Sequence, residues 1–167
     1  MKKLLLALSA LLVVSFVSCT KEEDELDIDV SKPSYLVNNY WKVTEVEVNP
    51  DFENENSFLS SVYQNLPLCF RDNIYDFTTS TTLTIDESHV KCDANHPQLS
   101  YFHYLVSNND KSLMIYTNPE DPGASTWFNG EITTINVEKF TTTEFKTIGN
   151  KIQQTVTTYE IDKKKNK

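Results

Sequence analysis

The stretch TEFKTIGNKIQQTVTTYEI, residues 143–161, sets the fold expected for this chain. Two runs rich in threonine, valine, isoleucine and aromatic residues, 143–148 and 151–161, flank the pair Gly149-Asn150. Such runs are typical of strands, and a two-residue break containing glycine is typical of a tight turn. The stretch therefore predicts two antiparallel strands joined as a hairpin.

Similar runs recur toward the N-terminus, separated by Asn, Asp, Gly and Pro. They predict six further strands at 40–48, 73–78, 81–86, 101–106, 112–116 and 131–139. Turns are expected at 108–111 and at Asn129-Gly130, with a loop at 118–123. Short connections without crossover helices favour an up-and-down topology. Eight such strands can close into a single antiparallel β-barrel, an all-β fold without exposed edges; a β-sandwich is the alternative.

The apolar residues of the first predicted strand do not all fall on one face of a regular strand. Trp41 and Val43 share one face, whereas Val46 and Val48 belong to the other if the strand is regular. Either a bulge near Thr44 resets the alternation, or one of the two pairs faces outward.

One short helix is expected at 56–66, between the first two strands of the barrel. Asn56 or Ser57 could cap its start, and Pro67 would end it. The apolar residues at helical spacing are Phe58, Leu59, Val62, Tyr63 and Leu66. The pattern predicts an amphipathic helix that covers one end of the barrel.

The N-terminus has the pattern of a cleavable export signal. Lys2 and Lys3 precede an apolar run, 4–17, which as a helix would span about 21 Å. That is short of the roughly 30 Å hydrocarbon core of a bilayer. The sequence FVSC at 16–19 resembles a lipobox, in which the cysteine takes a diacylglycerol before cleavage. The resemblance implies a signal peptide at 1–18 and lipidation of Cys19; ordinary secretion, with Cys19 as a structural thiol, is the alternative.

The charged residues after Cys19 are expected to form a flexible acidic tether, 19–37. A cysteine followed by lysine and paired acids also resembles the lipoprotein export signal of Bacteroidota-type bacteria. In that group the signal directs lipoproteins to the outer face of the outer membrane. The resemblance implies a surface-exposed protein that is held to the membrane by its lipid.

Composition narrows the classes of partner. Removal of residues 1–18 leaves 149 of 167 residues and, because two lysines are lost, changes the formal net charge from −9 to −11. This acidity argues against nucleic-acid and anionic-lipid partners. Three glycines, Gly123, Gly130 and Gly149, are too few for a phosphate-binding glycine loop. We expect one monomeric domain, 38–162, and a disordered basic tail, 163–167.

The region from 40 to 161 resembles the lipocalin-like domains of Bacteroidota lipoproteins. The matching stretches are WKVT (41–44), LCFRDNIYDF (68–77), LTI (83–85), VKCD (90–93) and NDKSL (109–113). The resemblance implies a lipocalin-like barrel. The functions of that family are mostly unassigned, so it implies a scaffold rather than a ligand.

Lipidation of Cys19 would leave Cys69 and Cys92 as a pair. In an oxidising compartment a disulfide is expected, and the loop-entropy model gives it about 3.5 kcal/mol of stabilisation. The alternative is a metal site, because His89, Asp93 and His96 lie close to Cys92 in sequence. We expect the disulfide, with no metal and no cofactor.

Catalysis finds little support in the sequence. No nucleophile-elbow pattern occurs. Four acids that could serve in glycoside hydrolysis are assigned to the outward parity of their strands, as solvated groups: Glu45, Asp76, Asp86 and Glu144. We therefore expect that the protein is not an enzyme.

Two kinds of binding remain. Trp41, Tyr75, Phe77 and Tyr104 are predicted to face inward, where they line a pocket for a small apolar or amphipathic molecule or simply fill the core. Alternatively, the barrel is a protein-interaction or inhibitor module in which Trp127 and Phe128 are exposed anchors. A structural envelope lipoprotein without a ligand is the third hypothesis.

Overall fold

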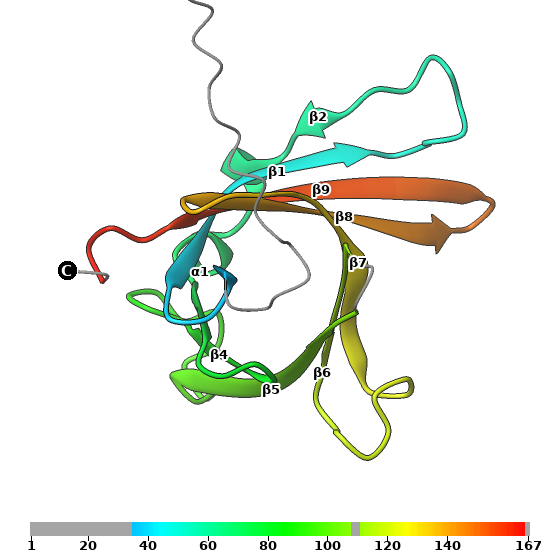
Figure 1. Ribbon diagram of the computed structural model, residues 1–167. Helices are drawn as coiled ribbons and strands as arrows, with labels where there is room; N and C mark the ends of the chain where they lie inside the picture. The colour runs from blue at the N-terminus through cyan, green and yellow to red at the C-terminus, as the bar shows by residue number, and fades with distance from the viewer. Residues whose placement is uncertain (1–34, 108–110, 166–167) are drawn as a thin grey trace, which may run out of the picture.

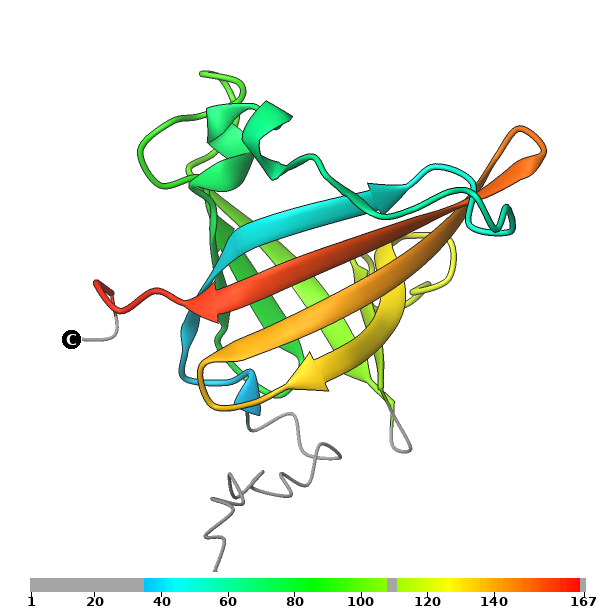
Figure 2. The same cartoon turned by 90° about the horizontal axis from the view of Figure 1, so that it is seen from above.

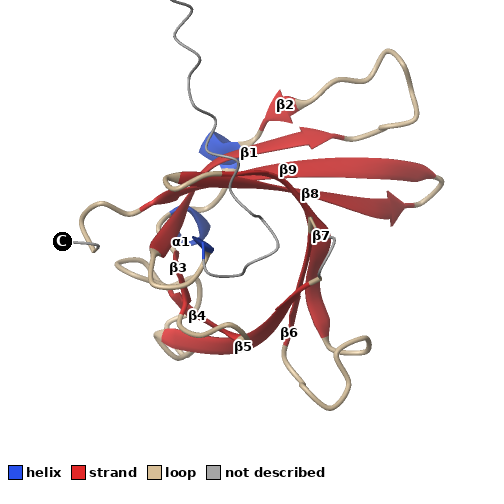
Figure 3. Cartoon of the chain, in the orientation of Figure 1, coloured by secondary structure: helices blue, strands red, loops and turns tan. Residues whose placement is uncertain are grey.

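The computed structural model describes residues 35–107 and 111–165, and these form a closed antiparallel barrel (Figures 1 and 3). The sheet runs in the order β2-β1-β3-β4-β5-β6-β7-β8-β9, and pairing of β1 with β9 closes eight of these strands into a ring. Strand β2 is an addition outside the ring. The strands are β1 (Tyr40–Asn49), β2 (Ser60–Ser61), β3 (Ile74–Phe77), β4 (Thr82–Asp86), β5 (Leu99–Val106), β6 (Ser112–Tyr116), β7 (Thr126–Ile135), β8 (Lys139–Ile148) and β9 (Lys151–Ile161). The predicted eight-stranded up-and-down barrel is confirmed, and closure excludes the sandwich.

The predicted hairpin is confirmed. Strands β8 and β9 pair without interruption from Lys139 opposite Glu160 to Ile148 opposite Lys151. Gly149 has φ of +66°, the left-handed conformation that glycine adopts without a Cβ penalty. The other turn expected near β6, at 108–111, lies largely outside the described residues.

The bulge near Thr44 is also confirmed. The pairing of β1 with β9 shifts register between Val43 and Glu45, so one extra residue enters β1 at that point. As a result Val43 and Val46 both pack against the core, although their spacing is odd.

The predicted helix at 56–66 is wrong. Phe58 and Leu59 are exposed, β2 lies at Ser60–Ser61, and a single 3₁₀ turn, η2, covers Tyr63–Asn65. The short helix α1, Leu68–Arg71, begins after Pro67. Pairing of β2 with the end of β1 provides backbone hydrogen bonds that a helix would have to give up, and no side chain caps η2.

The predicted turn at Asn129-Gly130 is wrong as well. Both residues lie inside β7, where Gly130 is opposite Leu113 of β6. The chain turns instead between β7 and β8, where the Asn136 side-chain oxygen accepts hydrogen bonds from the backbone N–H groups of Glu138 and Lys139 at 2.9 and 2.8 Å.

One end of the barrel, which we call the sealed end, is filled by large side chains. It lies where β1 begins, and its fully buried members include Leu36, Trp41, Phe77 and Phe140. Trp41 Nε1 donates a hydrogen bond of 2.9 Å to the Leu36 carbonyl. The folded body therefore begins before residue 38, because Leu36 belongs to the core rather than to a tether.

The opposite end, the far end, lies where β1 and β8 end and where β7 and β9 begin. Here the β8–β9 hairpin projects beyond β7, and the loop between β1 and β2 lies beside its tip (Figures 1 and 2). A backbone hydrogen bond of 2.7 Å from Phe52 N to the Ile152 carbonyl fixes that loop.

Candidate functional site

Three of the four aromatic residues expected to line a pocket pack against other rings at the sealed end. The ring of Trp41 meets that of Phe140 edge-on at 4.8 Å, and Phe77 meets Tyr104 in the same way at 4.8 Å. The hydroxyl of Tyr104 donates a 2.7 Å hydrogen bond to the Thr79 carbonyl. These three side chains fill the core, the second of the two roles open to them.

Tyr75, the fourth, lies beside Tyr159, and their ring centroids are 5.4 Å apart in an edge-on contact. Tyr159 in turn stacks on Phe140 at 4.4 Å, which places both tyrosines next to the sealed end. Asn73, which precedes β3, and two polar side chains of β8 lie around them. We call this group the interior polar cluster; its members are Asn73, Tyr75, Thr142, Glu144 and Tyr159.

Burial sets the electrostatics of this cluster. Desolvation raises the pKa of Tyr75 to about 12, and a hydrogen bond with the Asn73 side chain opposes that rise. Desolvation is also the main reason that the pKa of Tyr159 is raised; nearby Tyr75 and Glu144 add to the shift, and the Thr142 hydroxyl opposes it. Both phenols are therefore neutral at ordinary pH.

Asn73 Oδ1 has no hydrogen-bond partner within the described part of the chain. The Thr142 hydroxyl is only 1% exposed and interacts with the Tyr159 phenol. A buried polar atom left unpaired costs about 1–3 kcal/mol. The remaining strands contribute apolar side chains to the same interior, among them Phe102, Ile115 and Phe128. The combination suits a small molecule that is apolar over most of its surface and carries a hydrogen-bonding group.

Glu144 does not face solvent as expected from the sequence. It lies two residues beyond Thr142 in a regular strand and therefore shares its inward face. Its side chain is 14% exposed and pairs at 2.9 Å with the ammonium of Lys146, which is 59% exposed. Along the inner face of β8, the buried hydroxyl of Thr142 is thus followed, toward the far end, by the ion pair of Glu144 and Lys146.

Trp127 and Phe128 do not form the exposed patch that the sequence suggested. Both lie in β7, and Phe128 packs against the core opposite Ile115. Only Trp127 is exposed, by 50%, with its ring 5.2 Å from that of Phe102.

The disulfide between Cys69 and Cys92 is confirmed and joins α1 to the loop between β4 and β5. The Cys92 sulfur is thus not a free thiolate ligand, and no group of three metal-ligating side chains occurs in residues 35–107 and 111–165. His96 instead lies 3.8 Å from the Asp93 carboxylate. Cys19, the candidate lipidation site, lies outside the described residues.

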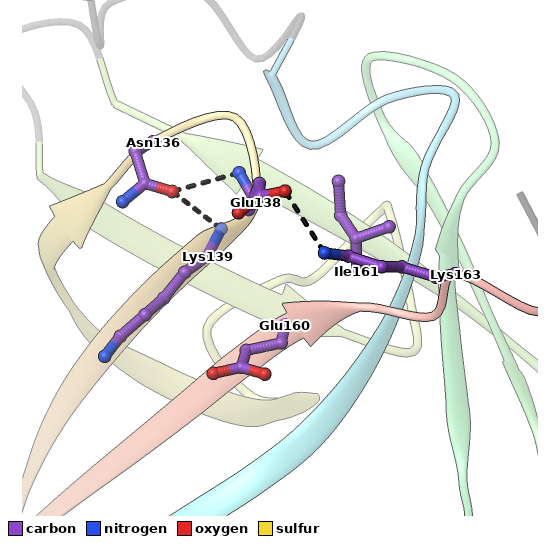
Figure 4. A pocket seen from close by; sticks show the side chains of 6 residues that line it. All are labelled: Asn136, Glu138, Lys139, Glu160, Ile161 and Lys163. Atoms are coloured by element: carbon purple, nitrogen blue, oxygen red, sulfur yellow. Dashed lines mark hydrogen bonds and ion pairs between the residues drawn. The ribbon is translucent and has the colours of Figure 1, made fainter.

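A surface pocket of about 220 Å³ lies by the turn between β7 and β8 (Figure 4). It is lined by Asn136, Glu138, Lys139, Glu160, Ile161 and Lys163. Lys163 pairs with Glu138 at 3.3 Å, and Lys165 pairs with Asp86 at 2.7 Å, so part of the basic tail lies against acidic groups of the body. Two of its four charged residues, Glu138 and Lys163, pair with each other, and no contact among the described residues points to a ligand at this pocket.

Within the described ranges, no helix has the length and apolar character needed to cross a membrane. No family model matches this chain, and comparison with curated proteins finds no similar sequence.

Proposed function

We propose that this protein is an envelope lipoprotein, anchored through Cys19 and exposed at the cell surface, whose barrel binds a small amphipathic molecule. The observation that carries the binding proposal is the interior polar cluster. Asn73 holds a buried oxygen without a partner among the described residues, beside the buried Thr142 hydroxyl, two neutral phenols and an apolar wall. Buried polar groups in a core that only packs apolar side chains normally have hydrogen-bond partners. A ligand with one hydrogen-bonding group would provide such a partner here.

Binding is tested with cis-parinaric acid, a fluorescent amphipathic probe, on the purified full-length protein. We expect its fluorescence to rise on binding, and Thr142→Val and Tyr159→Phe to weaken binding several-fold. Thr141→Val is the matched control, because Thr141 is also buried but points to the other face of β8. Equal effects of Thr141→Val and Thr142→Val would contradict a specific role for the cluster.

A second measurement needs no chosen probe. Native mass spectrometry of the protein purified from its own host should reveal a retained molecule, and the Thr142→Val variant should retain less of it. If wild-type protein carries no added mass and cis-parinaric acid gives no signal, the barrel is not a binding module.

The anchor is supported by the lipobox-like residues 16–19 and is tested separately. Cys19→Ala should move the protein from the membrane fraction to the soluble fraction, without the mass of the acyl chains. Added protease should digest wild-type protein on intact cells if the protein is on the outer face. Processed Cys19→Ala protein that stays in the membrane fraction would contradict lipid anchoring.

A further inference from the structure

The outer half of β8 is a sheet edge. Pairing between β7 and β8 covers only Glu131–Ile135 of β7 and ends at Thr143 of β8. Pairing between β8 and β9 continues to Ile148. Among the described residues, no strand pairs with the other side of β8 at 144–148. The backbone groups on that side are a template for another strand.

The sequence of this edge is complementary to itself. In an antiparallel pair of two copies centred on Phe145, Glu144 of each copy is opposite Lys146 of the other. Thr143 is already opposite Glu131 of β7, so pairing between the two copies is limited to 144–146, and the Phe145 side chains meet at the axis. Opposite charges and aromatic pairs at directly opposed positions each stabilise a sheet by about 0.2–1 kcal/mol. Moving the centre by one residue places Lys146 opposite Lys146, or Glu144 opposite Glu144, which is unfavourable.

Exposed apolar side chains accompany the edge. Phe145 is 46% and Ile148 is 58% exposed, and Phe52 lies against Phe145 with ring centroids 5.0 Å apart. A free edge flanked by exposed apolar residues favours association, and natural proteins usually block such edges. Lys146 is the cation at this edge, and its charge is already matched by Glu144.

We infer that two copies of this chain associate through β8, edge to edge and antiparallel, with Phe145 on the two-fold axis. The contact is isologous, so it closes at a dimer and does not extend into a fibre. The inner faces of both hairpins lie on the same side of the joined sheet. Each Lys146 then lies between the Glu144 of its own chain and the Glu144 of the other copy. This differs from the monomer expected from the sequence.

Cross-linking tests the register on the full-length protein under mild oxidation. Directly opposed Cα atoms in an antiparallel pair are about 4.5–5.5 Å apart, within the range that a disulfide spans. We expect Phe145→Cys to give a covalent dimer in high yield. Tyr101→Cys, on the exposed face of β5, and wild-type protein are the controls and should stay at background. Phe145→Cys yields no greater than those of Tyr101→Cys would overturn the proposal.

Exchange of the charges at positions 144 and 146 tests whether these residues pair between two copies. Light scattering measures the dimer content, and circular dichroism confirms that each variant is folded. Lys146→Glu places four carboxylates together and should reduce dimer content several-fold. The double variant Glu144→Lys with Lys146→Glu restores both cross-strand pairs and should regain it. A dimer insensitive to both variants would show that a different surface is used. A wild-type protein that is monomeric at every concentration, in detergent and in membranes, would exclude the dimer and would leave ligand binding untouched.

Discussion

Gly130 of β7 lies against the carbonyl oxygen of Thr143 of β8, at the point where these two strands separate. A Cβ at position 130 would lie 2.7 Å from that oxygen and 2.7 Å from the Phe128 ring. Real Cβ atoms are essentially never so close to another atom. The absence of a side chain at this position therefore allows the contact that closes the ring of strands before β8 leaves it.

Gly130→Ala should reduce the free energy of unfolding by about 1–3 kcal/mol, the usual cost of an overpacked interior. The affected atom is backbone, which cannot move without disturbing the pairing of β7 with β8. Gly123→Ala is the matched control, because nothing lies within 4 Å of the added Cβ. Urea unfolding of both variants measures the difference; equal midpoints would show that the contact at Gly130 is unimportant.

Replacement by phenylalanine should destabilise the protein far more at one of the two tryptophans of the chain than at the other. Trp41→Phe removes the buried donor to the Leu36 carbonyl and leaves a gap at the sealed end, so we expect a loss of about 2–4 kcal/mol. Trp127→Phe changes a half-exposed ring and should cost less than about 1 kcal/mol. Thermal unfolding of the pair checks this order, and a larger loss at Trp127 would contradict the packing described for the sealed end.

Reduction of the disulfide should destabilise the protein by about 3.5 kcal/mol, because the released loop gains entropy in the unfolded state. Denaturant unfolding with and without reductant measures the loss. The double variant Cys69→Ala with Cys92→Ala should have the lower stability in both conditions. A stability unaffected by reductant in wild-type protein would be incompatible with the cross-link.

Alkali should unfold the protein in a window set by its buried tyrosines. The pKa values of Tyr75 and Tyr104 are raised to about 12, against about 10 in an unfolded chain. A raised folded-state pKa gives stability that is fully present below about pH 10 and is lost as the pH rises toward about 12.

Ultraviolet absorbance of ionised tyrosine and circular dichroism, followed between about pH 9 and about pH 13, test this window. Part of the tyrosine signal should appear only together with the loss of the folded-state circular dichroism. Protein in denaturant, by contrast, should titrate in one step near about pH 10. Tyr75→Phe should retain its fold to higher pH than wild type. If every tyrosine ionises while the circular dichroism is still that of the folded barrel, these phenols are not buried.

The barrel itself could be predicted because its strands are marked by local chemistry. Gly149 and Asn150 fix the turn between β8 and β9, and thereby the register of every pair along that hairpin. The change of parity around Thr44 was likewise visible in the spacing of Trp41, Val43 and Val46, and the bulge is where that spacing requires it.

The errors arise where tertiary contacts override local patterns. Asn129-Gly130 has the composition of a turn, but the small residue is needed for the approach of β8. The apolar residues at 56–66 have helical spacing, but this segment contains β2, which pairs with β1 instead of forming a helix.

The interior polar cluster was largely missed, because the predicted strand at 143–148 began after Thr142. Counting outward from the turn at Gly149-Asn150 places Phe140, Thr142 and Glu144 on one face, so the signal was present. The Tyr159 phenol was passed over because no short motif surrounds it. Its environment comes from Tyr75 and Phe140, which are distant in sequence.

The sealed end, which Leu36 and Trp41 help to fill, also determines where a tether would join the barrel. A chain anchored at Cys19 reaches the body through residues 20–34, which can extend over roughly 50 Å at about 3.3–3.6 Å per residue. It enters beside Leu36, at the sealed end. The Glu144–Lys146 pair and the free edge of β8 lie toward the opposite end, so an anchor at Cys19 would leave both clear of the point of attachment.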